Sequence, residues 1–195
     1  LKLNTTGYLN VAIGESSLDA NTTGNQNVAI GTYSLTSNTT AGGNTAIGSY
    51  ASYYNTTGHS NVGIGYESLR FNATGDYNVA VGRYSLNGAS GSSSDDNTAV
   101  GYMAGYAITS GSDNVAVGSN ALVANTSGTR NIAIGYKAYD GADTENDNIA
   151  IGYDALGGAV NGGEFNVAIG NYSMDALTTA DENTAVGYNA MTGAT

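Results

Sequence analysis

A five-residue motif, Asn-[Val/Ile/Thr]-Ala-[Ile/Val]-Gly, recurs along the whole chain at a nearly constant spacing. It first appears as NVAIG from Asn10 and last as NTAVG from Asn183. Successive motif asparagines lie 17 residues apart, with a spacing of 19 after Asn78 and of 18 after Asn148. One pentapeptide buries almost no apolar surface. A fixed period therefore predicts that the copies stack and bury their surface together, as in a solenoid.

The consensus unit is N-[VIT]-A-[IV]-G-x-x-[AS]-L-x-x-N-T-T-G-x-x, and its columns are numbered here from the motif asparagine. The alternation in columns 2 to 4 predicts a short strand. A second strand is expected over columns 6 to 10, with columns 8 and 9 on opposite faces. Asn-Thr-Thr-Gly in columns 12 to 15 is typical of a turn.

These features predict an all-β fold: a parallel β-solenoid, or β-roll, of about eleven 17-residue coils. It would be a single repeat domain over residues 1–195. At about 4.8 Å per stacked strand the rod would be on the order of 50 Å long.

The small residue in column 3 suggests a close neighbour. We expect Val and Ile of columns 2 and 4 to fill the coil interior and column 3 to face another chain, in a closed cyclic arrangement such as a homotrimer. The alternative is that column 3 lines a cramped part of its own coil. The predicted inter-chain residues are Ala12, Ala29, Ala46, Gly63, Ala80, Ala99, Ala116, Ala133, Ala150, Ala168 and Ala185.

Composition excludes several classes of partner. The chain has 16 Asp and Glu against 5 Lys and Arg, a formal charge of −11, which argues against nucleic-acid binding. No apolar run approaches the length of a membrane span, so no membrane insertion of this segment is expected. The chain has no Cys, so the sequence does not indicate the redox compartment.

At the level of these motifs, the repeated NVAIG followed by Ala or Ser three residues later resembles the YadA-like head repeat of trimeric autotransporter adhesins. It is also similar to repeats of bacteriophage tail fibres. The resemblance implies a left-handed, trimeric parallel β-roll on a bacterial cell surface or a virion tail fibre. The unit here is longer, because it carries the additional Asn-Thr-Thr-Gly turn.

The motif asparagines are expected to stack as a structural ladder, bonding to one another and to the turn backbone. They are Asn10, Asn27, Asn44, Asn61, Asn78, Asn97, Asn114, Asn131, Asn148, Asn166 and Asn183.

Tyrosines are frequent just after the glycine corner. Those in column 6 are candidates for stacking on sugar rings, although covering the strand edge or a neighbouring chain explains them too. These possible glycan-facing residues are Tyr66, Tyr102, Tyr136, Tyr153 and Tyr188.

Chemistry beyond binding has little support in the sequence. Asp143, Glu145 and Asp147 alternate within one loop and form a weak calcium candidate, although solubility also explains them. His59 is the only histidine and no carboxylate pair recurs beside a nucleophile, so we predict no catalytic residues, no cofactor and no enzymatic activity.

Three functions remain open. The first is a structural or adhesive extracellular fibre module that presents or spaces a binding surface for a host cell, matrix or glycan. The second is a subunit that stacks head to tail into a filament, since Leu1 falls in column 9 and Thr195 in column 13, inside a coil. The third is a tail-fibre shaft with a glycan-binding, tyrosine-rich flank. The first and third are compatible with a segment of a longer fibre.

Overall fold

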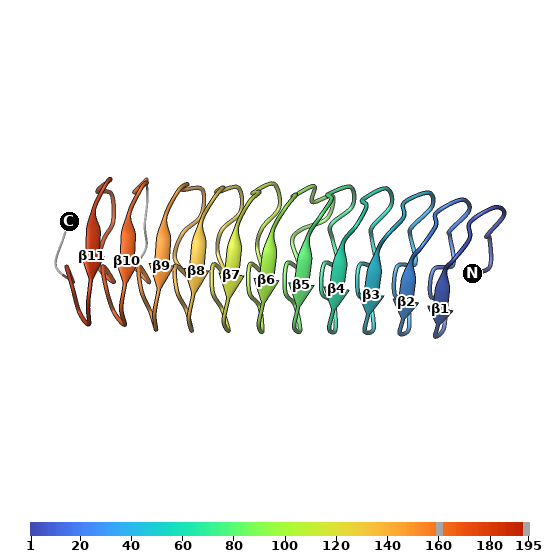
Figure 1. The fold of residues 1–195 in the computed structure, drawn as a ribbon, viewed down its shortest axis with the longest axis horizontal. Helices are drawn as coiled ribbons and strands as arrows, with labels where there is room; N and C mark the ends of the chain where they lie inside the picture. The colour runs from blue at the N-terminus through green and yellow to red at the C-terminus, as the bar shows by residue number, and fades with distance from the viewer. Residues whose placement is uncertain (159–161, 193–195) are drawn as a thin grey trace.

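The computed structural model describes residues 1–158 and 162–192, so Thr195 lies outside the described residues. Its parallel strands form one sheet in sequence order, with one strand per motif (Figure 1). No helix occurs in the part of the chain that the structure describes, and hence no helix that could cross a membrane. The predicted parallel β-solenoid is confirmed. The strands are β1 (Val11–Ile13), β2 (Val28–Ile30), β3 (Thr45–Ile47), β4 (Val62–Ile64), β5 (Val79–Val81), β6 (Thr98–Val100), β7 (Val115–Val117), β8 (Ile132–Ile134), β9 (Ile149–Ile151), β10 (Val167–Ile169) and β11 (Thr184–Val186).

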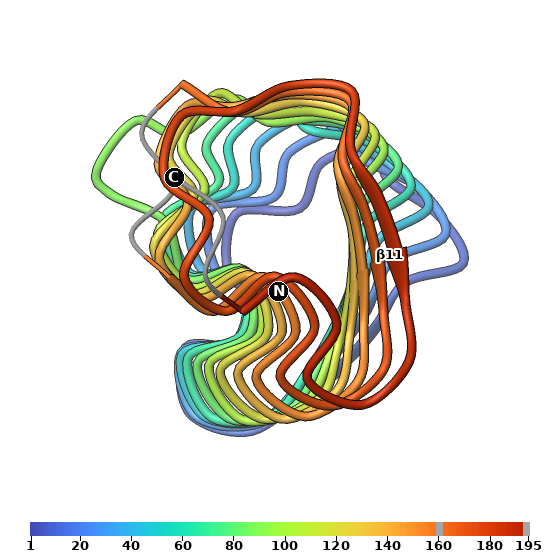
Figure 2. The same cartoon turned by 90° about the vertical axis from the view of Figure 1, so that its left-hand side faces the viewer.

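Equivalent columns stack directly on one another. Ala12 pairs with Ala29, for example, and Ala29 with Ala46. The register survives both longer spacings, because Val79 still pairs with Thr98 and Ile149 with Val167. The extra residues are taken up away from the sheet; after β5 the chain projects beyond the outline of the other coils (Figure 2).

Backbone hydrogen bonds join adjacent coils around much of the circumference, not only in the sheet. The N–H of Val28 donates to the Asn44 carbonyl at 2.8 Å, and the N–H of Leu35 donates to the Ala51 carbonyl at 3.0 Å. In the Thr-Thr turn, the N–H of Thr22 donates to the Thr39 carbonyl at 2.8 Å. Stacking therefore satisfies backbone groups that a single coil would leave unpaired.

The column-5 glycine allows the coils to approach this closely at the corner after each strand. Gly31 has φ +133°, and a Cβ added there would lie 2.5 Å from the Gly48 carbonyl oxygen. Any larger residue would push the next coil away, which explains why column 5 is glycine in every unit.

The two faces of the sheet are reversed relative to our prediction, which placed columns 2 and 4 inside the coil. Column 3 points into the coil, where Ala29, Ala80 and Ala133 are fully buried within one chain, while columns 2 and 4 point outward and are only partly buried. The prediction that column 3 contacts another chain is therefore wrong, and its side chains are core residues. This correction covers Ala12, Ala29, Ala46, Gly63, Ala80, Ala99, Ala116, Ala133, Ala150, Ala168 and Ala185.

The second predicted strand is also wrong, because columns 6 to 11 form turns. Tyr33 and Leu35, in columns 7 and 9, have φ of 59° and 49°. These left-handed residues curl the chain so that Ser34 and Leu35 both point inward and both are fully buried. Burying a leucine is worth roughly 1.5–3 kcal/mol, which is comparable to the cost of two left-handed residues at roughly 1–2 kcal/mol each.

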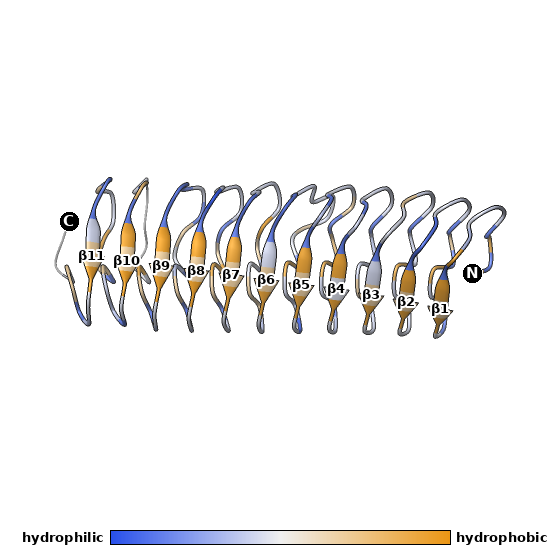
Figure 3. Ribbon diagram, viewed as in Figure 1, coloured by the Kyte–Doolittle hydropathy of each residue, from blue (hydrophilic) through white to orange (hydrophobic). Residues whose placement is uncertain are grey.

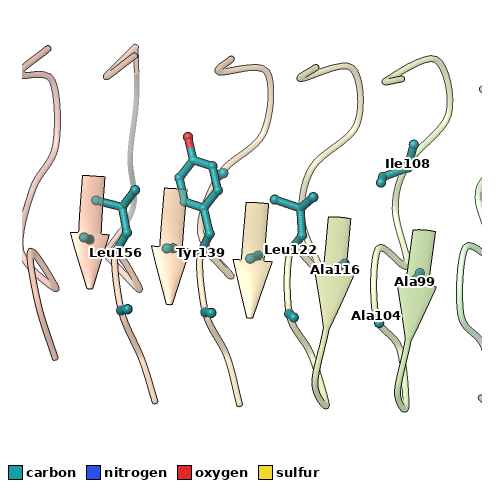
Figure 4. Packing of buried hydrophobic residues seen from close by; sticks show 14 of the residues in the cluster. Ala99, Ala104, Ile108, Ala116, Leu122, Tyr139 and Leu156 are labelled. Carbon is teal, nitrogen blue, oxygen red and sulfur yellow. The ribbon is translucent and has the colours of Figure 1, made fainter. Parts of the chain in front are cut away.

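The coil interior is narrow, and this is why column 3 must be small. Most coils hold one large apolar side chain, such as Leu122 or Leu156, which lies among alanines from columns 3 and 8 (Figure 4). Val or Ile at column 3 would compete with that leucine for the same space.

Several coils use a different set of core residues, and two of them show the pattern clearly. In the coil 97–113, column 9 is Gly105 and column 12 is Ile108, whose side chain lies 3.2 Å from where a Gly105 Cβ would be. In the coil 131–147, Tyr139 replaces the column-9 leucine and Ala142 replaces the column-12 asparagine, and both are fully buried. In these two coils a large residue in one column is matched by a small residue in the other, whereas the coil that begins at Asn166 buries both Met174 and Leu177 in these columns.

The inward orientation of column 3 yields a test. Replacing Ala116 by Leu should lower the free energy of unfolding by about 1–3 kcal/mol through overpacking, measured by denaturant titration of the circular dichroism signal. Ser127→Leu, at an exposed turn position, is the control and should change stability by less than about 0.5 kcal/mol. Equal stability of the two variants would contradict the assignment of column 3 to the core.

The buried Tyr139 makes a second test possible. Desolvation raises its pKa far above the ordinary value of 10.0, and its hydroxyl oxygen accepts a 2.6 Å hydrogen bond from Asn148 Nδ2. Because the unfolded chain ionises this phenol first, its contribution to stability is complete below pH 10 and falls by about 1.4 kcal/mol per pH unit above it. Tyr139→Phe should therefore lose less stability in alkali than the unmodified protein.

The measurement is the unfolding free energy between about pH 8 and about pH 11. Tyr153→Phe, which removes an exposed phenol, is the control and should keep the alkaline loss of the unmodified protein. An identical alkaline loss in Tyr139→Phe would show that this phenol is not held neutral by burial.

Candidate interaction surfaces

The most extensive candidate surface is the sheet face, defined here as the side chains of columns 2 and 4 on β1–β11. It consists of Val, Ile and Thr only, and the strands form an apolar row along the rod that is paler where column 2 is threonine, on β3, β6 and β11 (Figure 3). Away from the ends of the sheet, Val100, Ile134 and Ile169 are still 37–38% exposed.

The sheet face is large for an exposed apolar surface. Three residues along the strand and eleven stacked strands give a strip roughly 10 Å by roughly 50 Å, or roughly 500 Å². Contiguous apolar patches of this size on single chains often mark interaction sites. Parallel sheets are also normally covered on both faces, and here one chain covers only the inner one.

The column-1 asparagines form a continuous ladder inside the rod. The N–H of Asn131 donates to Oδ1 of Asn114 at 2.9 Å, and the N–H of Asn148 donates to Oδ1 of Asn131 at 3.0 Å. Asn131 Nδ2 also donates to the Glu145 carbonyl at 2.8 Å. Most members are fully or almost fully buried, so the ladder carries structure and is not a ligand-binding row.

Sequence reasoning missed a second buried asparagine column, column 12. Asn21 and Asn38 in this column are fully buried, and Asn38 Nδ2 donates to Asn21 Oδ1 at 3.0 Å. Both columns meet at one acceptor: the Gly24 carbonyl receives Asn10 Nδ2 at 2.8 Å and Asn21 Nδ2 at 3.1 Å. The spacing of 11 residues between the two asparagines, which recurs in the coils that begin at Asn10, Asn27, Asn44, Asn61 and Asn114, is the sequence signal that could have predicted this pairing.

Column 16 carries side chains that cap the backbone of the preceding coil. Asp76 Oδ1 accepts the N–H of His59 at 2.6 Å, and Asp95 Oδ1 accepts the N–H of Asp76 at 2.7 Å. His59, the single histidine, takes part in the same way, because its Nδ1 accepts the N–H of Gly42 at 3.1 Å. Asp76 and Asp95 are therefore structural hydrogen-bond acceptors as well as surface charges.

The calcium candidate is not assembled in the structure. The Glu145 carboxylate turns inward, where Oε2 accepts the N–H groups of Asp143 and Thr144 at 2.9 and 3.0 Å. Asp147 pairs instead with Arg130 at 2.6 and 2.7 Å, and this hydrogen-bonded guanidinium lowers the pKa of the carboxyl group. Within residues 1–158 and 162–192, no three acidic, His or Cys side chains form a group that could hold a metal ion.

The tyrosines that follow the glycine corner form two aromatic ladders along the rod. In the first, consecutive ring centroids lie 5.2, 6.4, 5.6 and 6.3 Å apart. In the second they lie 5.2, 5.3 and 6.0 Å apart. The N-terminal ladder comprises Tyr33, Tyr50, Tyr66, Tyr84 and Tyr102, and the C-terminal ladder comprises Tyr136, Tyr153, Tyr172 and Tyr188.

The two ladders are separated by Ser119 and Asn120, which occupy columns 6 and 7 of the intervening coil. The possible glycan-facing tyrosines of column 6 are the exposed members, at 41–45% for the four inner ones and 72% for Tyr188. Column-7 tyrosines such as Tyr84 are only partly exposed. A change between column 6 and column 7 within a ladder thus alters how far the tyrosine ring projects from the rod, while consecutive rings remain adjacent.

Comparison with protein-family models, with curated proteins and with solved structures found no match to this chain.

The asparagine ladder can be tested directly. Asn131→Ala removes the acceptor of the Asn148 N–H and the donor to the Glu145 carbonyl, so it should destabilise the protein by about 1–3 kcal/mol. Asn171→Ala is the control, because it removes only an exposed 3.0 Å hydrogen bond from the Tyr153 N–H and should cost less than about 1 kcal/mol. Similar costs in denaturant unfolding would argue against a special role for the buried ladder.

Proposed function

We propose that this chain forms the rod of a homotrimeric extracellular fibre, in which three copies bury their sheet faces against one another along a common axis. The observation that supports this most strongly is the outward-facing row of Val and Ile on a parallel sheet whose inner face is already covered. Burying that row would remove the largest apolar surface of the rod from water.

A second copy of the same chain suits this surface better than a compact partner. The occupant must offer an apolar ridge roughly 50 Å long with a spacing of about 4.8 Å, and every copy carries such a ridge. Closed cyclic symmetry about an axis parallel to the rods would keep equivalent coils level with one another and would leave no copy with an uncovered face. Threonine at Thr45 and Thr98 adds small polar groups without placing a charge on the face.

The role that we propose for the rod is to present or space a binding surface for a host cell, matrix or glycan. Its support is the resemblance of the repeat to adhesin heads and phage tail fibres, together with a uniform architecture that changes length by adding coils. The same resemblance supports a location on a bacterial cell surface or a virion tail.

The assembly is tested by charging the sheet face. A triple variant with Val100→Glu, Ile134→Glu and Ile169→Glu should convert trimers to monomers while leaving the circular dichroism spectrum unchanged, since these side chains face away from the core. Multi-angle light scattering gives the mass of the particle, and the unmodified protein should have three times the mass of one chain.

The control places the same three charges elsewhere, with Thr40→Glu, Thr57→Glu and Ser127→Glu at exposed turn positions. This variant should remain trimeric, which separates the effect of the face from that of net charge. An unmodified protein that stays monomeric at high concentration, or a face variant that stays trimeric, would refute the proposal.

A further inference from the structure

Two of the five Lys and Arg side chains, Lys2 near the N-terminus and Arg83, are without a carboxylate partner in the described part of this acidic rod. Arg70, Arg130 and Lys137 form ion pairs with Glu67, Asp147 and Asp140. Arg83, in contrast, takes part in no ion pair among residues 1–158 and 162–192, although the chain contains 16 acidic residues. Its side chain is exposed in the middle of the N-terminal tyrosine ladder.

Aromatic rings hold Arg83 in place. The guanidinium carbon lies 4.6 Å from the centroid of Tyr84 and 5.5 Å from that of Tyr66. Its Nη2 also donates to the Tyr84 hydroxyl oxygen at 3.1 Å. Only the Nη2 group donates a hydrogen bond within the described residues, so other N–H donors of the guanidinium remain available for a ligand.

The neighbouring rings offer apolar surface beside that cation. Tyr66 and Tyr102, on either side of Tyr84, are 41% and 45% exposed. They are inclined to Tyr84 by 77° and 60°, so neither ring lies flat against it. The result is an exposed row of ring surfaces and hydroxyl groups with one fixed positive charge at its centre.

We propose that this row, Tyr66, Arg83, Tyr84 and Tyr102, binds a carboxylate-bearing saccharide chain that lies along the rod. Tyrosine rings combine an apolar face with a hydroxyl group, which suits the C–H face and the hydroxyls of a sugar. The Arg83 guanidinium supplies a planar pair of donors that matches a carboxylate. The coil repeat of about 4.8 Å is close to the length of one pyranose unit, so successive sugars would meet successive coils.

Charge explains the choice of an acidic saccharide over other anionic polymers. A nucleic acid gains its affinity by neutralising many phosphates, and a rod of charge −11 with one unpaired arginine in this row cannot do that. A uronic-acid chain needs only one well-placed cation if its rings also stack. The surrounding negative charge would reject polyanions that cannot stack.

The second ladder is an internal comparison within the same molecule. Tyr136, Tyr153 and Tyr188 repeat the exposed column-6 rings, but the nearby cation, Lys137, is paired with Asp140. The C-terminal ladder therefore offers stacking surface without a free cation. Only the N-terminal ladder should distinguish an acidic sugar from a neutral one.

The test uses the intact chain and two probes, a hexamer of galacturonic acid and its fully methyl-esterified form, measured by isothermal titration calorimetry at low and physiological salt. The unmodified protein should bind the acid at least about tenfold more tightly than the ester. Arg83→Gln should weaken binding of the acid by about tenfold and leave binding of the ester unchanged. Such a tenfold change corresponds to about 1.4 kcal/mol.

Matched variants separate this site from general charge and from general stacking. Arg130→Gln makes the same charge change at a paired arginine and should leave the affinity for the acid unchanged. Tyr66→Leu should weaken binding of both probes, whereas Tyr153→Leu in the C-terminal ladder should not alter the preference for the acid.

The proposal is overturned if the acid and the ester bind equally, if neither binds, if Arg83→Gln binds like the unmodified protein, or if hexaglutamate binds as tightly as the saccharide. It does not rest on the trimeric assembly. Light scattering on the same samples reports the oligomeric state separately, so failure of the saccharide proposal can be distinguished from failure of the trimer proposal.

Discussion

Hydrogen bonds between the backbones of successive coils set the geometry of this rod. They act along the long axis and pair each column with its own copy in the next coil, from the strand of Val28 to the turn of Thr22. Equivalent side chains are therefore held one strand spacing apart, whatever their chemistry. Asparagine ladders, column-16 caps and tyrosine rows all follow from this one constraint. A side chain that can hydrogen-bond to, or stack on, an equivalent side chain finds one in the same column of the next coil.

The second constraint is the narrowness of a 17-residue coil. One leucine-sized side chain fills most interiors, and the opposing positions can hold little more than a methyl or hydroxyl group. Gly105 makes room for Ile108, and Ala142 accompanies the large Tyr139, whereas the coil that begins at Asn166 buries both Met174 and Leu177. Much of the remaining interior is polar, yet most asparagines of columns 1 and 12 bond along their own column and to a shared carbonyl; Asn55 Oδ1 is a buried amide oxygen that has no partner among the described residues.

The outer surface differs sharply around the coil. The sheet face presents a continuous apolar strip, the turns present Thr and acidic groups, and the glycine corner presents tyrosines. Arg83 is held by Tyr84 and Tyr66, whereas Arg130 is held by Asp147. Lateral assembly and ligand recognition would therefore use different sides of the same coil, and the two proposed roles do not compete for residues.

The sequence by itself determined that the chain is a stack of parallel coils. One copy of the motif buries almost no apolar surface, so eleven copies at a period of 17 residues must stack to bury it together. It also located the strand, the glycine corner, the ladder asparagines and the tyrosine row. It did not determine which strand face points inward: our assignment of Val28 and Ile30 to the interior was wrong, because alternation in Val28, Ala29 and Ile30 predicts two faces without saying which is inside. Only the tertiary structure decided this, through left-handed backbone at Tyr33 and Leu35 that turns two consecutive side chains inward and leaves room only for alanine opposite them.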